Sequence, residues 1–256
     1  MGRLEGKTAL VTGGASGIGE AICRRLSQEG AWVAVADLNE TKGVKLAREL
    51  GKGSLFVKLD VTQEAEWQAA IETVTSQFGG LDILVNNAGM MKPGSIEDAT
   101  LADWRTAMTV NGEGVFLGCK AAVAAMKGRT ADQSQGTIIN IASVMGFRAQ
   151  PMHVCYSATK AAVRMITKSV AIHCAKAGYR IRVNCVLPGA IDTELLRGNI
   201  KPGQTEADYF STLKQRYPTG RIGTPKDIAD GVVFLASEDS DFITATDLLI
   251  DGGSSA

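Results

Sequence analysis

Thr8-Ala-Leu-Val-Thr12 is an apolar run of strand length, and it leads directly into Gly13-Gly-Ala-Ser-Gly-Ile-Gly19. Residues 17–29 then have the pattern of a helix, so the glycines occupy the turn between a strand and a helix. Glycine lets the backbone turn tightly and approach a ligand, and the first turn of a helix offers unpaired N–H groups to a phosphate. The stretch predicts a cradle for a dinucleotide pyrophosphate, with contacts from Gly13, Ser16, Gly17, Ile18 and Gly19.

The same alternation of strand and helix continues along the chain. Strands are expected at residues 8–12, 32–36, 54–59, 81–85, 137–141, 180–186 and 246–250. Helices are expected at 17–29, 41–50, 63–78, 101–127, 155–177 and 225–236. The strands lack strict polar alternation, as expected where helices cover both faces of a parallel sheet. The pattern predicts an α/β fold, a single Rossmann-type doubly wound domain over residues 1–256 with a seven-stranded, mainly parallel sheet.

Two segments interrupt this alternation. Residues 128–136 are polar and rich in turn-forming residues, which predicts a surface loop. Residues 190–224 form a long connection with several prolines and glycines around a short helical piece. Because connections of that length inside a compact domain are usually functional, we expect a substrate lid at about 190–224.

Asp37 follows the second strand, about 20 residues beyond the glycines. A carboxylate there accepts hydrogen bonds from the adenosine ribose hydroxyls and repels a 2′-phosphate. Positions 14–18 and 38–39, which include Leu38, carry no Arg or Lys to favour that phosphate. The sequence therefore favours NAD over NADP, although capping a turn would also explain an aspartate here.

Tyr156 and Lys160 are four residues apart in Tyr156-Ser-Ala-Thr-Lys160, so a helix places both side chains on one face. A phenol has an ordinary pKa of about 10, which a nearby ammonium and a positively charged nicotinamide would lower. Such a phenol can act as a general acid or base. The spacing alone is common, and a solvated lysine beside a half-buried tyrosine would also produce it.

Further polar residues follow the expected strands. Ser143 comes just after the strand at 137–141, Asn86-Asn-Ala-Gly89 closes the fourth strand, and Pro188-Gly189 closes the sixth. Parallel strands bring their carboxyl ends to one edge of the sheet, where open α/β folds bind ligands. We therefore expect these residues to meet at one site.

Taken together, these residues resemble the short-chain dehydrogenase/reductase family over essentially the whole chain. The matching elements are Thr12–Gly19, Asp60-Val61, Asn86–Gly89, Asn111, Ser143, Tyr156-x-x-x-Lys160 and Pro188-Gly189. The resemblance implies hydride transfer between NAD and a secondary alcohol or ketone, as in bacterial secondary-alcohol and hydroxysteroid dehydrogenases. Gly112 departs from the pattern, because a larger residue usually follows the asparagine, and it would loosen the helix there.

The resemblance also implies roles for individual residues. Tyr156 would be the general acid/base, and Ser143 would orient the substrate oxygen. Lys160 would bind the nicotinamide ribose and lower the tyrosine pKa, and Asn111 would hold a water that extends a proton relay from Lys160. Asp60 and Val61 would contact adenine, Asn87 the adenosine side, and Ile191 and Thr193 the nicotinamide amide. Further cofactor contacts are expected from Leu38, Ala88, Gly89, Pro188 and Gly189.

The expected substrate pocket is apolar, and its lining would be Val144, Met145, Met152, Leu195, Leu196 and the lid residue Phe210. His153 and Cys155 flank the catalytic stretch, and we expect them to line the pocket. No Arg or Lys is evidently placed to hold a carboxylate or phosphate. These features predict a neutral, hydrophobic alcohol or ketone, a class that includes cyclic and steroid-like compounds.

Two other functions stay open. A 3-oxoacyl-carrier-protein reductase shares nearly all these motifs, but Asp37 counts against the NADPH that such reductases generally use. A catalytically silent dinucleotide-binding regulator belongs to a different class of protein, and the presence of all four catalytic positions counts against it. A sugar-nucleotide epimerase would need an extra substrate domain, for which the chain is too short.

The amino-acid composition limits which partners, cellular compartments and metals are expected. Lys plus Arg and Asp plus Glu are both 27, and no basic stripe stands out, which argues against nucleic acid or a membrane surface as partner. Five scattered cysteines and the absence of a signal-peptide pattern predict a cytoplasmic protein. Two histidines without a cysteine cluster predict no metal. The family resemblance implies a homotetramer in which the helices at 101–127 and 155–177 pack between subunits.

Overall fold

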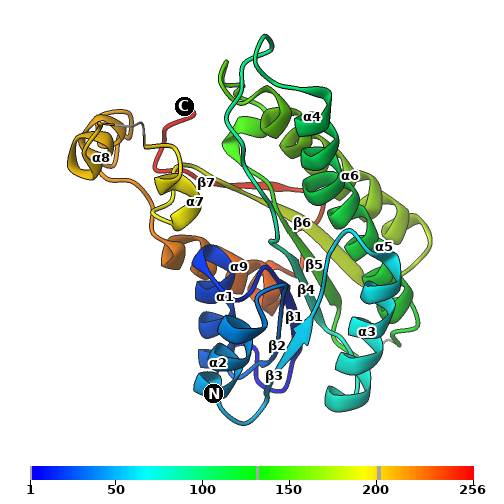
Figure 1. Cartoon of the computed structure of the whole chain (residues 1–256). Coiled ribbons are helices and arrows are strands. Elements are labelled where there is room, and N and C mark those ends of the chain that lie inside the picture. The colour runs from blue at the N-terminus through cyan, green and yellow to red at the C-terminus, as the bar shows by residue number, and fades with distance from the viewer. Residues whose placement is uncertain (1, 131–132, 201–202) are drawn as a thin grey trace.

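A parallel seven-stranded sheet forms the centre of the computed structural model, which describes residues 2–130, 133–200 and 203–256 (Figure 1). The strand order is β3-β2-β1-β4-β5-β6-β7. The predicted α/β class and the seven strands are confirmed. The strands are β1 (Thr8–Thr12), β2 (Trp32–Asp37), β3 (Ser54–Lys58), β4 (Ile83–Asn86), β5 (Gly136–Ile141), β6 (Ile181–Pro188) and β7 (Asp247–Ile250).

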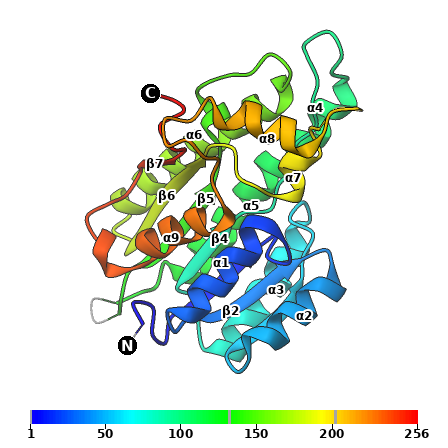
Figure 2. The ribbon, with the colours of Figure 1, turned by 90° about the vertical axis from the view of Figure 1, so that its left-hand side faces the viewer.

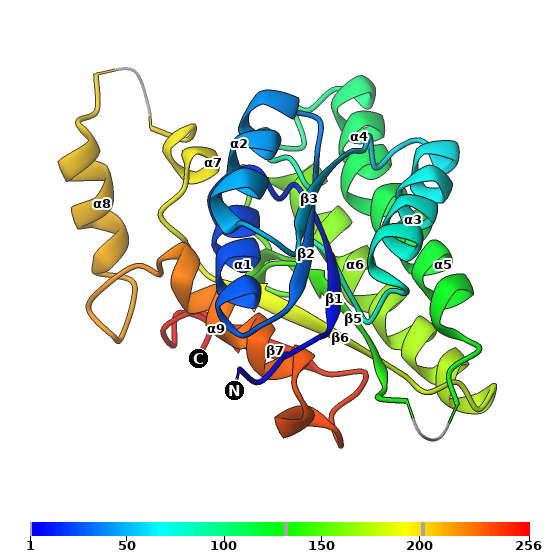
Figure 3. The same ribbon diagram turned by 90° about the horizontal axis from the view of Figure 1, so that it is seen from below.

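Helices cover both faces of the sheet (Figure 3). One face carries α1 (Gly17–Gln28), α2 (Glu40–Leu50) and α9 (Pro225–Ala236), and the other carries α3 (Glu64–Phe78), α5 (Gly114–Met126) and α6 (Val154–Lys176). Successive strand residues point to opposite faces, so Ala9 and Val11 join the first layer while Leu10 joins the second. Both faces are buried, which explains why the strands read as continuous apolar runs.

The strand order reverses between β1 and β4, which pair with each other while their following loops diverge. Hydrogen bonds from Thr12 hold the two strand ends together at this point. Its hydroxyl accepts from the backbone N–H groups of Asn87 and Ala88, each at 3.0 Å. Its carbonyl accepts from the Asn87 side-chain amide at 2.9 Å. Ligands of doubly wound folds bind in the crevice that such a reversal creates.

The segment predicted as one helix over 101–127 is helical but not uniform. It consists of α4 (Leu101–Ala107), a π-helical turn η1 (Met108–Glu113) and α5, so the helical span is as predicted and contains a π turn that the sequence did not indicate. Asn111 lies in the widened turn, and its side chain bonds to Met90 rather than to its own helix. Gly112 is also in this turn. π turns commonly occur at functional sites.

The long connection after β6 contains α7 (Glu194–Arg197) and α8 (Glu206–Lys214), which stand away from the sheet (Figure 1) and lie above α1 and α9 in the view of Figure 2. Residues 201–202 of the predicted lid, and residues 131–132 of the predicted loop at 128–136, lie outside the described residues. Short 3-10 turns occur at η2 (Val144–Gly146) and η3 (Glu238–Ser240). Within the described ranges, no helix has both the length and the apolar character required to cross a membrane.

Candidate active site

A cavity of about 1920 Å³ lies along the carboxyl ends of the strands. Its walls come from the loops after β1, β2, β4, β5 and β6 and from the segment around α7. Pockets for small ligands usually measure roughly 300–1,000 Å³. The cavity therefore has room for a dinucleotide together with a second molecule.

The glycine loop forms one end of this cavity. Gly13 and Gly17 adopt φ angles of +59° and +54°, which favour glycine. A Cβ at Gly13 would lie 2.9 Å from the Ala88 Cα, so the loop approaches the β4 side closely. Ser16 caps α1 without using its side chain on the helix, which leaves first-turn N–H groups for a ligand. This arrangement fits a pyrophosphate.

Gly19 does not line the cavity, although Gly13, Ser16, Gly17 and Ile18 do. A Cβ at Gly19 would lie 2.0 Å from the Gly13 carbonyl oxygen and 2.6 Å from the Asn87 side-chain nitrogen. Its small size therefore permits the start of α1 to pack against the loop. That Gly19 also contacts the cofactor stays a prediction.

Asp37 lines the cavity at the end of β2, with the exposed Leu38 beside it. One carboxylate oxygen accepts from the Ala15 N–H at 3.0 Å, and the other accepts from the Asn39 N–H at 2.8 Å. The aspartate thus caps the turn and also holds the glycine loop. Because a carboxylate oxygen can accept more than one hydrogen bond, Asp37 keeps the capacity to bind ribose hydroxyls.

The other expected cofactor residues also border the cavity. Asp60 is held by its own turn, because its carboxylate accepts from the Thr62 backbone and hydroxyl at 3.0 and 2.7 Å. The Val61 carbonyl accepts from the indole of buried Trp67 at 2.9 Å, which ties this loop to α3. The cavity lining includes Asp60, Val61, Asn87, Ala88, Gly89, Pro188, Gly189, Ile191 and Thr193.

Ser143, Tyr156 and Lys160 all line the cavity. The Ser143 hydroxyl accepts from the Met145 N–H at 3.1 Å and lies close enough to Tyr156 to lower the pKa of the phenol. Lys160 is buried, donates to the Ile141 carbonyl at 2.9 Å and lies 5.6 Å from the centre of the Tyr156 ring. β5 and α6 thus bring a hydroxyl, a phenol and an ammonium into one cluster.

Burial dominates the electrostatics of this cluster. It raises the pKa of Tyr156 to about 12, and the hydrogen bond from Ser143 acts in the opposite direction. Burial also lowers the pKa of Lys160 to about 8. Tyr156 is therefore protonated at neutral pH and can donate a proton to an oxygen beside it. That Lys160 lowers the phenol pKa stays a prediction.

Asn111 uses its side chain to connect three segments. Its Oδ1 accepts from the Met90 N–H at 2.8 Å, and its Nδ2 donates to the Met90 carbonyl at 2.9 Å and to the Thr159 hydroxyl at 3.1 Å. The β4 loop, the π turn and α6 are thereby joined next to Lys160. That Asn111 also holds a water molecule stays a prediction.

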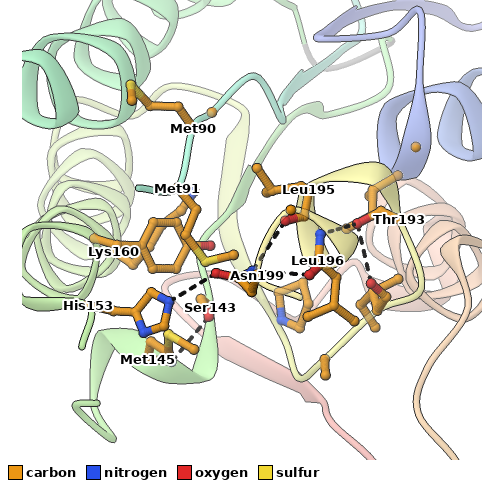
Figure 4. Close-up of a pocket in the computed structure, with 18 of the residues that line it drawn as sticks. Met90, Met91, Ser143, Met145, His153, Lys160, Thr193, Leu195, Leu196 and Asn199 are labelled. Carbon is orange, nitrogen blue, oxygen red and sulfur yellow. Dashed lines mark hydrogen bonds between the residues drawn. The ribbon is translucent and has the colours of Figure 1, made fainter. Parts of the chain in front are cut away.

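The residues predicted to line a substrate pocket, Val144, Met145, Met152, Leu195 and Leu196, border the cavity, and so does His153. His153 lies beside Met145 in Figure 4. Phe210 does not line the cavity, so its predicted place in the pocket is wrong. Its ring lies 5.2 Å from the Arg197 guanidinium and packs edge-on against Tyr209, which lines the cavity instead. Cys155 borders a small separate pocket behind Tyr156.

Several lining residues were not anticipated from the sequence. Met90 and Met91 directly follow Gly89, so extending the fourth strand-end motif by two residues would have found them. Arg148 and Arg216 also border the cavity. Both arginines are exposed and lie on segments whose approach depends on tertiary folding. Among the residues described, no three metal-binding side chains cluster as a metal site.

Comparisons with known proteins agree with this geometry. The family model described as enoyl-(acyl carrier protein) reductase matches residues 13–255. The chain is 41% identical over 249 residues to a 3-beta-hydroxysteroid dehydrogenase of Comamonas testosteroni, covering 97% of this chain and 96% of that protein. It is 39% identical to an NADP-dependent (R)-specific alcohol dehydrogenase of Lentilactobacillus kefiri, covering 99% and 98%. A 3-ketoacyl-(acyl-carrier-protein) reductase from Brucella melitensis, solved with NADH, has a TM-score of 0.91 at 35% identity and covers 99% and 100%.

The buried Lys160 predicts a specific dependence of stability on pH. Its folded-state pKa of about 8 lies below the ordinary value of about 10.4, so between these values the unfolded chain binds more protons. The free energy of unfolding should therefore rise with pH from 8 to 10, by at most about 1.4 kcal/mol per pH unit from this group. Chemical denaturation of wild type and Lys160→Met at several pH values measures the difference.

Lys127→Met, at an exposed position, is the matched control. Parallel pH curves for wild type and Lys160→Met would contradict the assignment.

Proposed function

This chain belongs to the short-chain dehydrogenase/reductase family, and we propose that it uses NAD(H) to interconvert a neutral, hydrophobic secondary alcohol and its ketone. The observation that carries the proposal is the cluster of Ser143, Tyr156 and Lys160 in a cavity with apolar walls. The same cavity contains the glycine loop and Asp37.

The residues present fit a nicotinamide dinucleotide. A Cβ at Gly13 would obstruct the narrow passage between the glycine loop and Ala88, and Ser16 leaves the N-terminus of α1 free for phosphate. Asp37 would hold the adenosine ribose. A bound nicotinamide supplies the acceptor or donor of hydride.

Side chains of the protein transfer the proton and bind the oxygen atom of the substrate that reacts. In ketone reduction, Tyr156 donates its phenolic proton to the carbonyl oxygen, and in alcohol oxidation its phenolate removes the hydroxyl proton. Ser143 donates a second hydrogen bond to that oxygen, so negative charge developing there has two partners. The Lys160 ammonium favours the phenolate through its positive charge.

The apolar walls support a hydrophobic substrate. Met145, Leu195 and Leu196 provide flexible, non-hydrogen-bonding surface, which suits a ring or steroid-like skeleton. The similarity to a hydroxysteroid dehydrogenase and an alcohol dehydrogenase favours the same class. Residues 190–224 act as the lid, because Leu195, Leu196 and Tyr209 border the cavity.

A carrier-protein reductase is the second candidate. It is favoured by the structural similarity to a 3-ketoacyl-(acyl-carrier-protein) reductase and by the exposed Arg148 and Arg216 beside the cavity, which could receive an acidic partner. The carboxylate of Asp37 counts against NADPH. Reduction of an acetoacetyl thioester that exceeds reduction of cyclic ketones would favour this candidate.

Replacing the general acid tests the chemistry. Tyr156→Phe should lower kcat/KM for secondary-alcohol oxidation by about 10³-fold, because the proton acceptor is lost. NADH binding, followed by fluorescence, should persist. A variant that keeps full activity would overturn the assignment, and a wild type that binds NADH but acts on no alcohol or ketone would indicate a regulator.

Oxidation by the wild type should accelerate as pH rises, because burial raises the Tyr156 pKa and the phenolate is the active form. Ser143→Ala removes a hydrogen bond that lowers this pKa. The rise in its pH–rate profile should therefore move to higher pH, with a lower rate at every pH. An unmoved profile would show that Ser143 does not influence the phenol.

Cofactor preference tests Asp37. Asp37→Asn keeps an oxygen for one of the two backbone N–H groups but removes the negative charge that repels a 2′-phosphate. The ratio of kcat/KM with NADP to that with NAD should rise about ten-fold or more, equal to about 1.4 kcal/mol. Wild type that already prefers NADP would refute the NAD assignment and favour the carrier-protein reductase.

We also propose a cytoplasmic homotetramer. All five cysteines are free and buried, which suits a reducing compartment. The outer surfaces of α5 and α6 expose Phe116, Met165 and Ile172, whose exposed fractions are 52%, 64% and 53%. Burying such side chains between copies of the chain would remove apolar surface from water.

Light scattering after size exclusion should give four times the chain mass of 26.9 kDa. Met165→Glu should reduce the particle size, because a carboxylate would be buried in the interface. A wild type with the mass of one chain would reject the tetramer.

A further inference from the structure

The wall of the substrate pocket contains two polar side chains that the proposed chemistry does not use. His153 and Asn199 are half-buried among methionines and leucines and face each other across the pocket (Figure 4). His153 precedes the first turn of α6, and Asn199 follows α7. The pair therefore links the catalytic helix to the segment proposed as the lid.

The contacts of Asn199 fix which of its side-chain atoms faces His153. The Asn199 Nδ2 donates to the carbonyls of Leu195 and Leu196 at 3.3 and 3.1 Å, so Oδ1 is the atom directed at His153. His153 Nε2 lies 3.5 Å from that oxygen, and the contact is attractive when Nε2 carries the proton. The other ring nitrogen, Nδ1, is buried and has no partner among the described residues.

A separation of 3.5 Å is at the outer limit of hydrogen bonding, so the contact is weak. A hydroxyl placed beside both atoms can accept from the imidazole N–H and donate to the amide oxygen at the same time. Two good hydrogen bonds would then replace one poor one. A carbonyl or ether oxygen can use only the imidazole donor, and a hydrocarbon can use neither.

The position of the pair determines where this hydroxyl lies in the substrate. The backbone around His153 is held by Gly94, whose N–H donates to the Met152 carbonyl at 2.7 Å and whose carbonyl accepts from the Val154 N–H at 3.3 Å. His153 is therefore a fixed group three residues, about one helical turn, before Tyr156. His153 and Tyr156 both line the cavity, so a molecule that reaches Tyr156 can also contact His153.

We propose that His153 and Asn199 form a hydroxyl-binding site, and that the substrate is a hydrophobic diol whose second hydroxyl occupies it. The inference rests on the proposed function for the identity of the reacting group. His153 and Asn199 act on specificity: they distinguish a diol from the matching mono-alcohol, while Ser143 and Tyr156 act on the reacting hydroxyl of both.

The test measures binding, so it does not depend on turnover. The protein saturated with NADH cannot oxidise an alcohol, and quenching or enhancement of NADH fluorescence then reports Kd. The probes are cyclohexanol and the cis and trans isomers of 1,3- and 1,4-cyclohexanediol. At least one diol should bind about ten-fold tighter than cyclohexanol, which corresponds to roughly the net gain of one to two hydrogen bonds.

Matched variants identify the residues responsible. His153→Phe keeps a ring but removes both nitrogens, and Asn199→Leu removes the acceptor, so each should abolish the preference for the diol. Asn199→Asp retains an acceptor oxygen and should retain a preference. His173→Phe replaces the second of the two histidines, which packs against Tyr179 away from the cavity, and should leave the wild-type ratio unchanged.

Equal affinity of the wild type for every diol and cyclohexanol, or a preference that survives both His153→Phe and Asn199→Leu, would overturn the inference. Turnover assays with the same compounds test the proposed function separately. A protein that prefers the diol in binding but oxidises neither compound would refute the proposed reaction and keep the hydroxyl site.

Discussion

The hydrogen bonds that join Thr12 to Asn87 and Ala88 hold the ends of β1 and β4 together where the strand order reverses. Strand pairing fixes β1 against β4 as far as Val11 and Val85, and these bonds continue that connection into the two loops that follow. The separation of the two loops matters because Gly13 already approaches Ala88 so closely that a single added carbon would collide. The hydroxyl and the carbonyl of Thr12 therefore extend the β1–β4 pairing to the edge of the glycine loop.

The same hydrogen bonding continues into the catalytic cluster. From the β4 loop, Met90 pairs with Asn111, and Asn111 also donates to Thr159 on α6. The next residue, Lys160, donates to the Ile141 carbonyl at the end of β5, two residues before Ser143. The glycine loop and the residues proposed to be catalytic thus belong to one connected set of contacts, which orders them with respect to each other.

The sequence predicts those structural features that depend on the pattern of residues within one short segment. Apolar runs locate the strands, because both sheet faces are buried, and the glycines between β1 and α1 identify the phosphate cradle. Local pattern could not reveal the π turn, because Asn111 bonds to Met90, about twenty residues earlier in the chain. It also could not distinguish Phe210 from Tyr209, since stacking on Arg197 decides which of two adjacent aromatic rings faces the cavity. Arg148 and Arg216 also border the cavity, but they lie on segments in which no sequence motif indicates a binding role.

The widened turn at Met108–Glu113 has a consequence for how the molecule assembles. A π turn is less favourable than a regular helix and persists where tertiary contacts support it, here through Asn111 to Met90 and Thr159. These contacts join segments distant in sequence, which form only after the entropy of loop closure has been overcome. A partly folded chain can hold helices and paired strands, but it has no catalytic geometry. Function in this molecule is a property of the completed fold.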